Sequence, residues 1–350
     1  MIVRFQMYHG KIDRQKTGKG KFFHRLAASL GDMGVEITCD PKVDVDVDVC
    51  INKPLYWPKN AKKKIVRLGP VEYDTNRKDL KEQWALSKKY IKFSDGIVYQ
   101  SDFSRDTYHK IVYDARGKKP ERVIFNGAPP APAVVPCPEV LGKDRKGPWD
   151  YNEYYHRHFL LSTREWVWEK RLEEGIKSFI LANLPHSHLW IAGHVWDQPK
   201  RFPPKQKTFY KKYGKPNIHF LGPLDDFAIQ LLYKHCHAML FLSWIDACPN
   251  SVVEALMAGC PVISNCCGGQ FELINLKSLE FGCAQIRSEN MWNFKPRNRR
   301  VQPKAYREGY ARHMNDVARN PQRVPPSCLN HIFIDTVAHK YKTFFEELLK

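Results

Sequence analysis

The sequence lacks the features that mark several other classes of protein. No apolar run approaches the length of a membrane span, and the first residues, Met1 to Tyr8, are typical of a short strand rather than a signal peptide. The ten cysteines include no Cys-x-x-Cys pair and follow no regular spacing. This usage predicts reduced thiols and therefore a cytoplasmic protein.

Acidic residues are few compared with basic ones. The chain has 56 Lys and Arg against 37 Asp and Glu, which gives a formal net charge of +19. Such an excess attracts phosphate, whether on a nucleotide, an anionic lipid headgroup or nucleic acid. No nucleic-acid-binding motif and no basic stripe interleaved with aromatic residues is evident, which argues against nucleic acid as the partner. Peripheral contact with an anionic membrane surface stays open.

The chain does contain a strand–helix–strand unit around residues 238–264. The apolar run Ala238 to Ser243 predicts a buried strand. Pro249 suits the start of a helix, because its missing N–H would have no partner there. Gly259 marks the end of that helix, and a second strand follows from Pro261.

The start of this helix predicts an anion site. The backbone N–H groups near Asn250, Ser251 and Val252 should lack intrahelical partners at the positive end of the helix dipole, which suits a phosphate. Asp246 lies in the preceding loop and Glu254 one turn into the helix. Carboxylates are poor ligands for phosphate but good acceptors for sugar hydroxyls. Together these residues predict a bound nucleotide sugar.

The same segment carries a family resemblance. Its residues are Asp246 and Glu254, with seven residues between them, followed by Gly259, Pro261, Gly268, Gly269 and Glu272. This pattern resembles the Glu-x7-Glu signature of the retaining family 4 glycosyltransferases, with Asp in place of the more usual first Glu. The resemblance implies the α/β GT-B architecture, in which two Rossmann-like lobes with parallel sheets face an interdomain cleft. An ordinary Rossmann-like unit with incidental acids is the alternative interpretation.

Length and composition suit two domains, since 350 residues are too many for one typical domain. We expect an N-terminal Rossmann-like, acceptor-binding domain over residues 1–127. Residues 128–150 begin with a proline-dense run that predicts an extended linker. Residues 151–330 would form the nucleotide-sugar-binding domain. Residues 331–350 predict a helix that, in this fold class, crosses back onto the first domain.

A second segment of the C-terminal half supplies cations. Arg164 leaves a predicted strand and Lys170 precedes a predicted helix, and the carboxyl ends of strands are where open α/β sheets bind ligands. The resembled family carries Arg and Lys here as pyrophosphate ligands, five positions apart. In this chain the separation is six and Arg171 follows, so either Lys170 or Arg171 could reach the phosphate, and exposed surface residues are the alternative. Gly222 begins a Gly-Pro-Leu turn that resembles the one packing against the nucleotide base.

The N-terminal half opens as a strand, a glycine-bearing loop and a helix over residues 22–30. By resemblance, Gly18 and Gly20 in that loop would face the interdomain cleft, where glycine lets the backbone approach a ligand closely. The spacing does not fit a Walker A loop. Three further segments resemble parts of the family's N-terminal domain: Arg67 to Asp74, Ile97 to Ser101 and Val123 to Gly127.

Residues Val43 to Val49 alternate valine with aspartate. Asp-x-Asp is the metal-binding pattern of the other large glycosyltransferase fold, so a manganese site is one interpretation. Strict alternation is more typical of a half-exposed strand, which we favour.

These observations and the family resemblance predict a retaining glycosyltransferase that moves a sugar from a nucleoside-diphosphate sugar to a hydroxyl of a glycan, lipid or protein-linked sugar. By resemblance, Glu254 would hold the ribose and Asp246 the sugar hydroxyls. Arg164 and Lys170 would stabilise the departing diphosphate, so no metal or other cofactor is expected. A nucleotide-sugar epimerase or phosphorylase of the same fold, or a non-catalytic basic protein that binds polyanions, remains an alternative.

Overall fold

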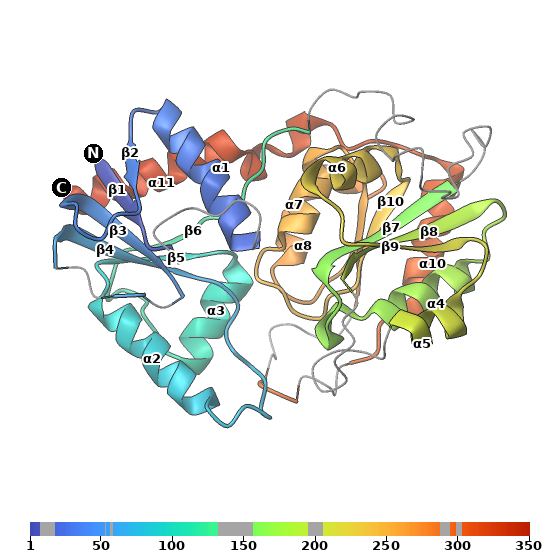
Figure 1. Cartoon of the computed structure of the whole chain (residues 1–350), viewed down its shortest axis with the longest axis horizontal. Coiled ribbons are helices and arrows are strands. Elements are labelled where there is room, and N and C mark those ends of the chain that lie inside the picture. Colours follow the sequence, from blue (N-terminus) through green and yellow to red (C-terminus); the bar gives the residue numbers. More distant parts are fainter. Residues whose placement is uncertain are drawn as a thin grey trace.

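A computed structural model describes residues 1–7, 18–52, 54–56, 59–131, 157–194, 206–287, 295–298 and 303–350. They form two α/β lobes side by side, as Figure 1 shows. Each lobe is built on a six-stranded parallel sheet with helices packed around it. The predicted two-lobed α/β fold with parallel sheets is therefore confirmed.

The N-terminal sheet has the strand order β2-β1-β3-β4-β5-β6. Its strands are β1 (Ile2–Phe5), β2 (Glu36–Thr38), β3 (Val45–Ile51), β4 (Ala61–Leu68), β5 (Gly96–Tyr99) and β6 (Glu121–Val123). Its helices are α1 (Gly18–Asp32), α2 (Leu80–Phe93) and α3 (Asp102–Ile111). The alternating valines of β3 are buried, as period-2 patterning predicts. The expectation of a half-exposed strand is wrong, because β3 is an interior strand and Asp48 on its other face is also buried.

The C-terminal sheet has the order β12-β11-β10-β7-β8-β9. Its strands are β7 (Arg157–Glu165), β8 (Ser187–His194), β9 (Ile218–Gly222), β10 (Ala238–Phe241), β11 (Val262–Asn265) and β12 (Ala284–Ile286). Its helices are α4 (Leu172–Ala182), α5 (Gln206–Tyr213), α6 (Asp226–His235), α7 (Asn250–Met257), α8 (Gln270–Leu273), α9 (Leu276–Leu279) and α10 (Arg307–Arg319), with a 3-10 turn η3 (Trp168–Lys170).

The order of the strands indicates where each sheet would bind a ligand. In the C-terminal lobe the chain runs outward from β7 to β9 and then returns to place β10 on the other side of β7. In the N-terminal lobe the same reversal falls between β1 and β3. Ligands of open α/β sheets bind outside the carboxyl ends of the strands at such a reversal. In the C-terminal lobe, the segments that follow β7 and β10 therefore lie where a ligand would bind.

The last helix, α11 (Ile334–Leu349), packs on the N-terminal lobe. Its buried face, which includes Val337, Tyr341 and Phe345, joins the core formed by α1, β1, β3 and β4. Two 3-10 turns precede it, η5 (Pro326–Cys328) and η6 (Asn330–Ile332). Most of the proline-rich segment 128–150 lies outside the described residues. Of the described helices, none is long and apolar enough to cross a membrane.

One local prediction is wrong. We expected Gly18 and Gly20 in a loop before a helix that starts at Phe22, but α1 already begins at Gly18. The two glycines form its first turn, and Gly20 is buried. Tertiary contacts routinely override the low helix propensity of glycine, and here Lys21 forms an ion pair with Asp226 of the other lobe.

Candidate functional site

The reversal point of the C-terminal sheet brings two predicted residues together. Lys170 ends η3 just after β7, and Asp246 lies in the loop after β10. Their side chains meet with Nζ 2.8 Å from Oδ2, and both are half-buried. The Trp244 N–H donates to the Glu169 carbonyl at 2.7 Å, which ties the two segments together through their backbones. A cation and a carboxylate thus sit where this fold places a ligand.

Helix α7 begins at Asn250, four residues after Asp246. Asn250 and Ser251 are half-buried in its first turn, whereas Val252 is fully buried. The expectation that the Val252 N–H lacks a partner is wrong, because it donates to the Pro249 carbonyl at 3.1 Å. This tight first turn leaves Ser251 as the member of the three whose N–H has no acceptor among the described residues. The expected anion site therefore narrows to the very start of the helix.

The N-terminal lobe holds the loop before α7 in place. The Asn126 side-chain amide donates to the Cys248 carbonyl at 2.6 Å and to Asn250 Oδ1 at 2.8 Å. Asn126 Oδ1 accepts a hydrogen bond from Arg67, whose Nε donates to the Tyr341 hydroxyl at 2.8 Å. Arg67 is 1% exposed. The sequence placed Arg67 and Asn126 in family-like segments but gave no sign that they reach α7.

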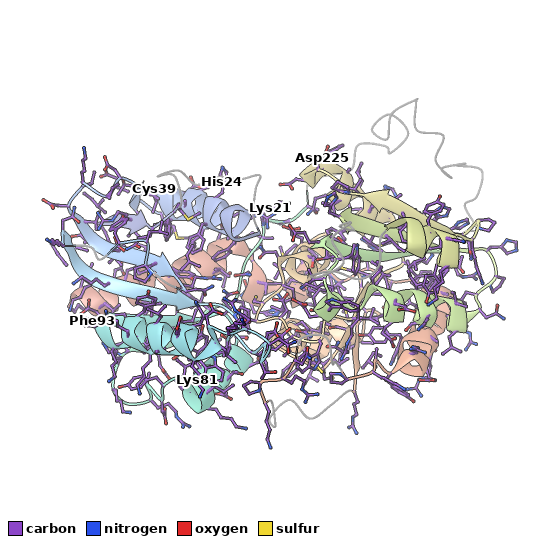
Figure 2. The ribbon with its side chains drawn as sticks, turned by 60° about the horizontal axis from the view of Figure 1, so that its bottom comes forward. Lys21, His24, Cys39, Lys81, Phe93 and Asp225 are labelled. Atoms are coloured by element: carbon purple, nitrogen blue, oxygen red, sulfur yellow. The ribbon has the colours of Figure 1, made fainter. Side chains whose placement is uncertain are left out.

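Glu254 forms an ion pair with a residue of the N-terminal lobe. It lies on α7, is 6% exposed, and accepts a hydrogen bond on Oε1 from Arg25 Nη2 of α1 at 2.7 Å. One turn earlier on α1, Lys21 pairs with Asp226 at the start of α6. Figure 2 shows Lys21 where the two lobes meet. Neither cation was predicted as a site residue.

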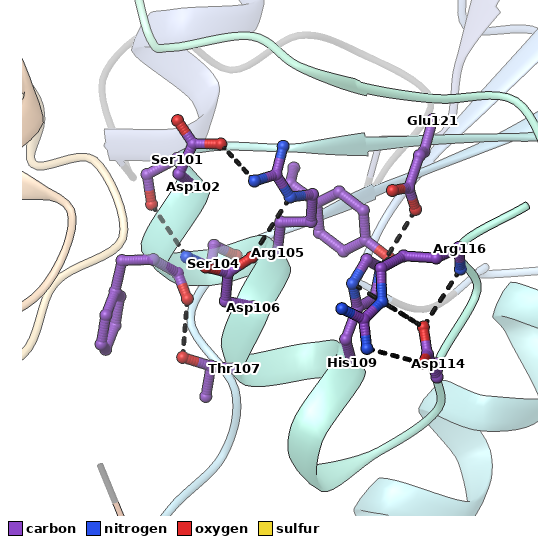
Figure 3. Close-up of polar contacts among 12 residues, drawn as sticks. Ser101, Asp102, Ser104, Arg105, Asp106, Thr107, His109, Asp114, Arg116 and Glu121 are labelled. Atoms are coloured by element: carbon purple, nitrogen blue, oxygen red, sulfur yellow. Dashed lines mark hydrogen bonds and ion pairs between the residues drawn. The ribbon is translucent and has the colours of Figure 1, made fainter. Parts of the chain in front are cut away.

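Glu272 makes a further contact between the lobes. Its two carboxylate oxygens accept from the N–H groups of Asp102 and Phe103 at the start of α3, each at 2.8 Å. In the same turn, Ser101 Oγ accepts from the Ser104 N–H at 3.1 Å (Figure 3). Burial is the main cause that raises the pKa of Glu272 to about 7, although the two backbone hydrogen bonds oppose it.

Gly268 and Gly269, which precede Glu272, allow the two lobes to approach closely here. A Cβ on Gly269 would lie 1.9 Å from the Ala247 carbonyl oxygen and 2.3 Å from Ser101 Oγ of the other lobe. A Cβ on Gly268 would clash with the backbone of Asp246, and its φ is +84°. Only glycine therefore lets this loop lie between the Asp246 loop and α3.

The remaining predicted residues lie around this centre. Arg164 is the next-to-last residue of β7, at the strand's carboxyl end. Arg171 is buried at the start of α4 with φ +53°, and its Nη2 donates to the Pro303 carbonyl. Of the two candidates, Lys170 is thus the one that lies beside Asp246. Gly222 ends β9 with φ +71° and open space beside its Cα.

The Asp-x-Asp segment forms strand β3. Asp46 pairs with Lys62 at 2.8 Å, and buried Asp48 pairs with Arg4 and accepts from Gln6 at 2.6 Å. Within the described ranges, no group of three His, Cys, Asp or Glu residues is placed to hold a metal.

Known proteins resemble both the fold and this part of the chain. The glycosyl transferases group 1 family model matches residues 145–281, which hold the segments after β7 and β10 and helix α7. No curated protein matches the sequence.

Solved structures match nearly the whole chain. HepE of Anabaena in complex with UDP-glucose is 13% identical, with a TM-score of 0.64 over 99% of this chain and 100% of that one. Sucrose-phosphate synthase of Thermosynechococcus elongatus is 12% identical, with a TM-score of 0.62 over 99% and 96%. A glycosyltransferase of Rickettsia africae is 15% identical, with a TM-score of 0.62 over 100% and 98%. The fold is GT-B. The family match and this GT-B fold together support a GT-B glycosyltransferase.

Proposed function

We propose that the chain is a retaining glycosyltransferase of the family 4 type, which transfers a sugar from a nucleoside-diphosphate sugar to a hydroxyl acceptor without a metal ion. The observation that carries the proposal is the Lys170–Asp246 pair at the reversal point of the C-terminal sheet, with 2.8 Å between Nζ and Oδ2. Its carboxylate lies in the loop that leads into α7. A cation and a helix start suit a diphosphate, and a carboxylate suits sugar hydroxyls.

Breaking the glycosidic bond leaves an oxocarbenium-like sugar and a diphosphate that gains negative charge. Lys170 and the Ser251 N–H would stabilise that charge as it develops. Arg164, at the end of β7, would add a second cation by family resemblance. The acceptor oxygen would attack the anomeric carbon on the face that the phosphate leaves, and the departing phosphate oxygen would take the hydroxyl proton. The configuration of the sugar is then retained.

Asp246 and Glu254 would bind different parts of the donor. Asp246 would bind the sugar hydroxyls while Lys170 turns from it toward the diphosphate. Glu254, one turn along α7, would hold the ribose. The turn at Gly222 would receive the base, since its open surface leaves room for a ring.

Donor screening tests this proposal. HepE was solved with UDP-glucose, and the pneumococcal transferase GtfA with UDP and GlcNAc, so UDP-sugars are the first candidates. Thermal unfolding should shift upward with one of the UDP-, GDP- or ADP-sugars, because a ligand that binds the native state raises its melting temperature. NMR of the product should then show the donor's anomeric configuration, with activity unchanged in EDTA. An inverted product or loss of activity in EDTA would contradict the mechanism.

The net charge of +19 favours a second candidate, a non-catalytic protein that binds polyanions such as an anionic membrane surface. Binding to anionic vesicles that falls steeply with salt, without any stabilisation by nucleotide sugars, would support that function instead. A product that forms without an acceptor would indicate an epimerase.

A further inference from the structure

Helix α1 presents two cations to the C-terminal lobe. Lys21 and Arg25 lie one turn apart, so their side chains share one face of the helix. Lys21 pairs with Asp226, and Arg25 Nη2 lies 2.7 Å from Glu254 Oε1. Of these two acids, Glu254 is the one on α7, whose start is the proposed diphosphate site.

The Arg25 side chain is mostly buried, but not all of its guanidinium N–H groups have a hydrogen-bond acceptor among the described residues. Its side chain is 19% exposed, against 7% for that of Glu254. Its Nη1 is buried and has no hydrogen-bond partner among the described residues. A guanidinium carries five N–H donors, and leaving an enclosed donor without an acceptor costs free energy. A ligand that brings oxygen atoms to Nη1 would remove that cost.

The position of Glu254 indicates which ligand could do so. Glu254 lies one turn after Asn250 on α7, so a nucleotide whose diphosphate sits at the helix start reaches the Glu254 carboxylate with its ribose. The ribose and phosphate oxygens then come next to the Arg25 guanidinium. Hydrogen bonds from a guanidinium to such oxygens are among the stronger ones in proteins.

We propose that Arg25 is a donor-binding residue supplied by the N-terminal lobe. Its Nη1 donates to an oxygen of the nucleoside diphosphate, while Nη2 keeps its ion pair with Glu254. This inference rests on the proposed function, because it needs the nucleotide to lie on α7. Donor affinity then depends on both lobes, and a bound nucleotide links α1 to α7.

Isothermal titration of UDP, GDP and ADP into wild type, Arg25→Ala, Arg25→Lys and Lys21→Ala, at one fixed salt concentration, tests it. For the nucleotide that wild type binds, Arg25→Ala should raise Kd by about 10- to 100-fold, since a hydrogen bond to a charged group is lost. Arg25→Lys should lie between, because lysine keeps the charge but not the planar fork. Lys21→Ala is the matched control and should change Kd by less than about threefold.

Each outcome decides a different claim. An Arg25→Ala variant that binds as tightly as wild type, or more tightly, would overturn the inference, because Arg25 would then only cover Glu254. An equal loss in Lys21→Ala would also overturn it, since any cation on this face would serve. If wild type binds none of the three nucleotides, the proposed function itself fails. Should Arg25→Ala not fold by circular dichroism, Arg25→Gln and Arg25→Lys carry the same comparison.

Discussion

The two lobes share a parallel six-stranded architecture, yet they bring opposite charges to their common surface. In three contacts the C-terminal lobe supplies a carboxylate and the N-terminal lobe a positive group: Asp226 with Lys21, Glu254 with Arg25, and Glu272 with the start of α3. The positive groups of the N-terminal lobe would attract an anionic ligand that binds between the lobes. The lobes therefore differ in role, because one carries the predicted donor-binding acids and the other carries cations that face them.

The largest expected effect is on catalysis in the C-terminal lobe. Lys170→Ala and Asp246→Asn should each lower kcat/KM by about 100- to 1,000-fold, because in the proposed function Lys170 binds the donor's diphosphate and Asp246 its sugar hydroxyls. Lys177→Ala is the control and should leave the rate unchanged, because Lys177 is a partly exposed lysine of the same lobe that pairs with Glu173 at 2.9 Å. Steady-state kinetics with the donor found by screening measures this, and wild-type rates in either site variant would rule out the site.

The second prediction concerns stability in the N-terminal lobe. Arg67 is buried against the rings of Phe22 and Phe23, with its guanidinium carbon 4.5 and 5.4 Å from their centroids, and it bonds Asn126 and Tyr341. Arg67→Ala should lower the free energy of unfolding by about 3–5 kcal/mol, because it leaves a cavity and unpaired polar groups.

Urea unfolding measures that loss. Arg67→Met, which keeps most of the volume, should lose less than Arg67→Ala. A loss below about 1 kcal/mol in Arg67→Ala would show that Arg67 does not stabilise this lobe.

The third prediction concerns pH at the lobe contact made by Glu272. Its pKa in the folded protein is about 7, against an ordinary value of 4.5. Between pH 4.5 and pH 7, Glu272 is therefore protonated more often in the folded state than in the unfolded state. The stability of wild type should then fall as pH rises from about 4.5 to about 7, because ionisation is favoured less in the folded state. Relative to Glu272→Gln, wild type should lose about 2–3 kcal/mol between pH 5 and pH 8. A difference that does not vary with pH would contradict this assignment.

The smallest effects are expected at exposed ion pairs, one in each lobe. Lys62 pairs with Asp46 at 2.8 Å and Lys212 with Glu173 at 2.9 Å, with 73% and 59% of the lysine side chains exposed. Solvent and salt screen such pairs, so Lys62→Ala and Lys212→Ala should have the same melting temperature as wild type. A clear drop in melting temperature would show that these surface charges matter to the fold.

How much the sequence predicts differs between the lobes. Strand β10, helix α7 and strand β11 follow from an apolar run, Pro249 and Gly259, because those signals are local. Lys170 and Asp246 were predicted separately, and strand order then brings them together. Val252 was misjudged because the Pro249 carbonyl accepts its N–H, a detail of turn geometry that residue types do not determine.

The cross-lobe contacts could not be predicted. Arg25 is 229 residues from Glu254 in the chain, and the pattern of α1 indicates only that this face is polar. The sequence predicts that Arg67 lies in a strand. It does not show that Arg67 is buried under α1 and forms a hydrogen bond with Asn126. Pairings of this kind depend on how two lobes dock, which no local signal specifies.

The most direct test of the central claim is the crystal structure of the chain with the nucleoside diphosphate that stabilises it. We expect diphosphate oxygens within about 3 Å of Lys170 Nζ and the Ser251 N–H, at the start of α7. A diphosphate bound elsewhere, with Lys170 still paired to Asp246, would contradict the proposed site.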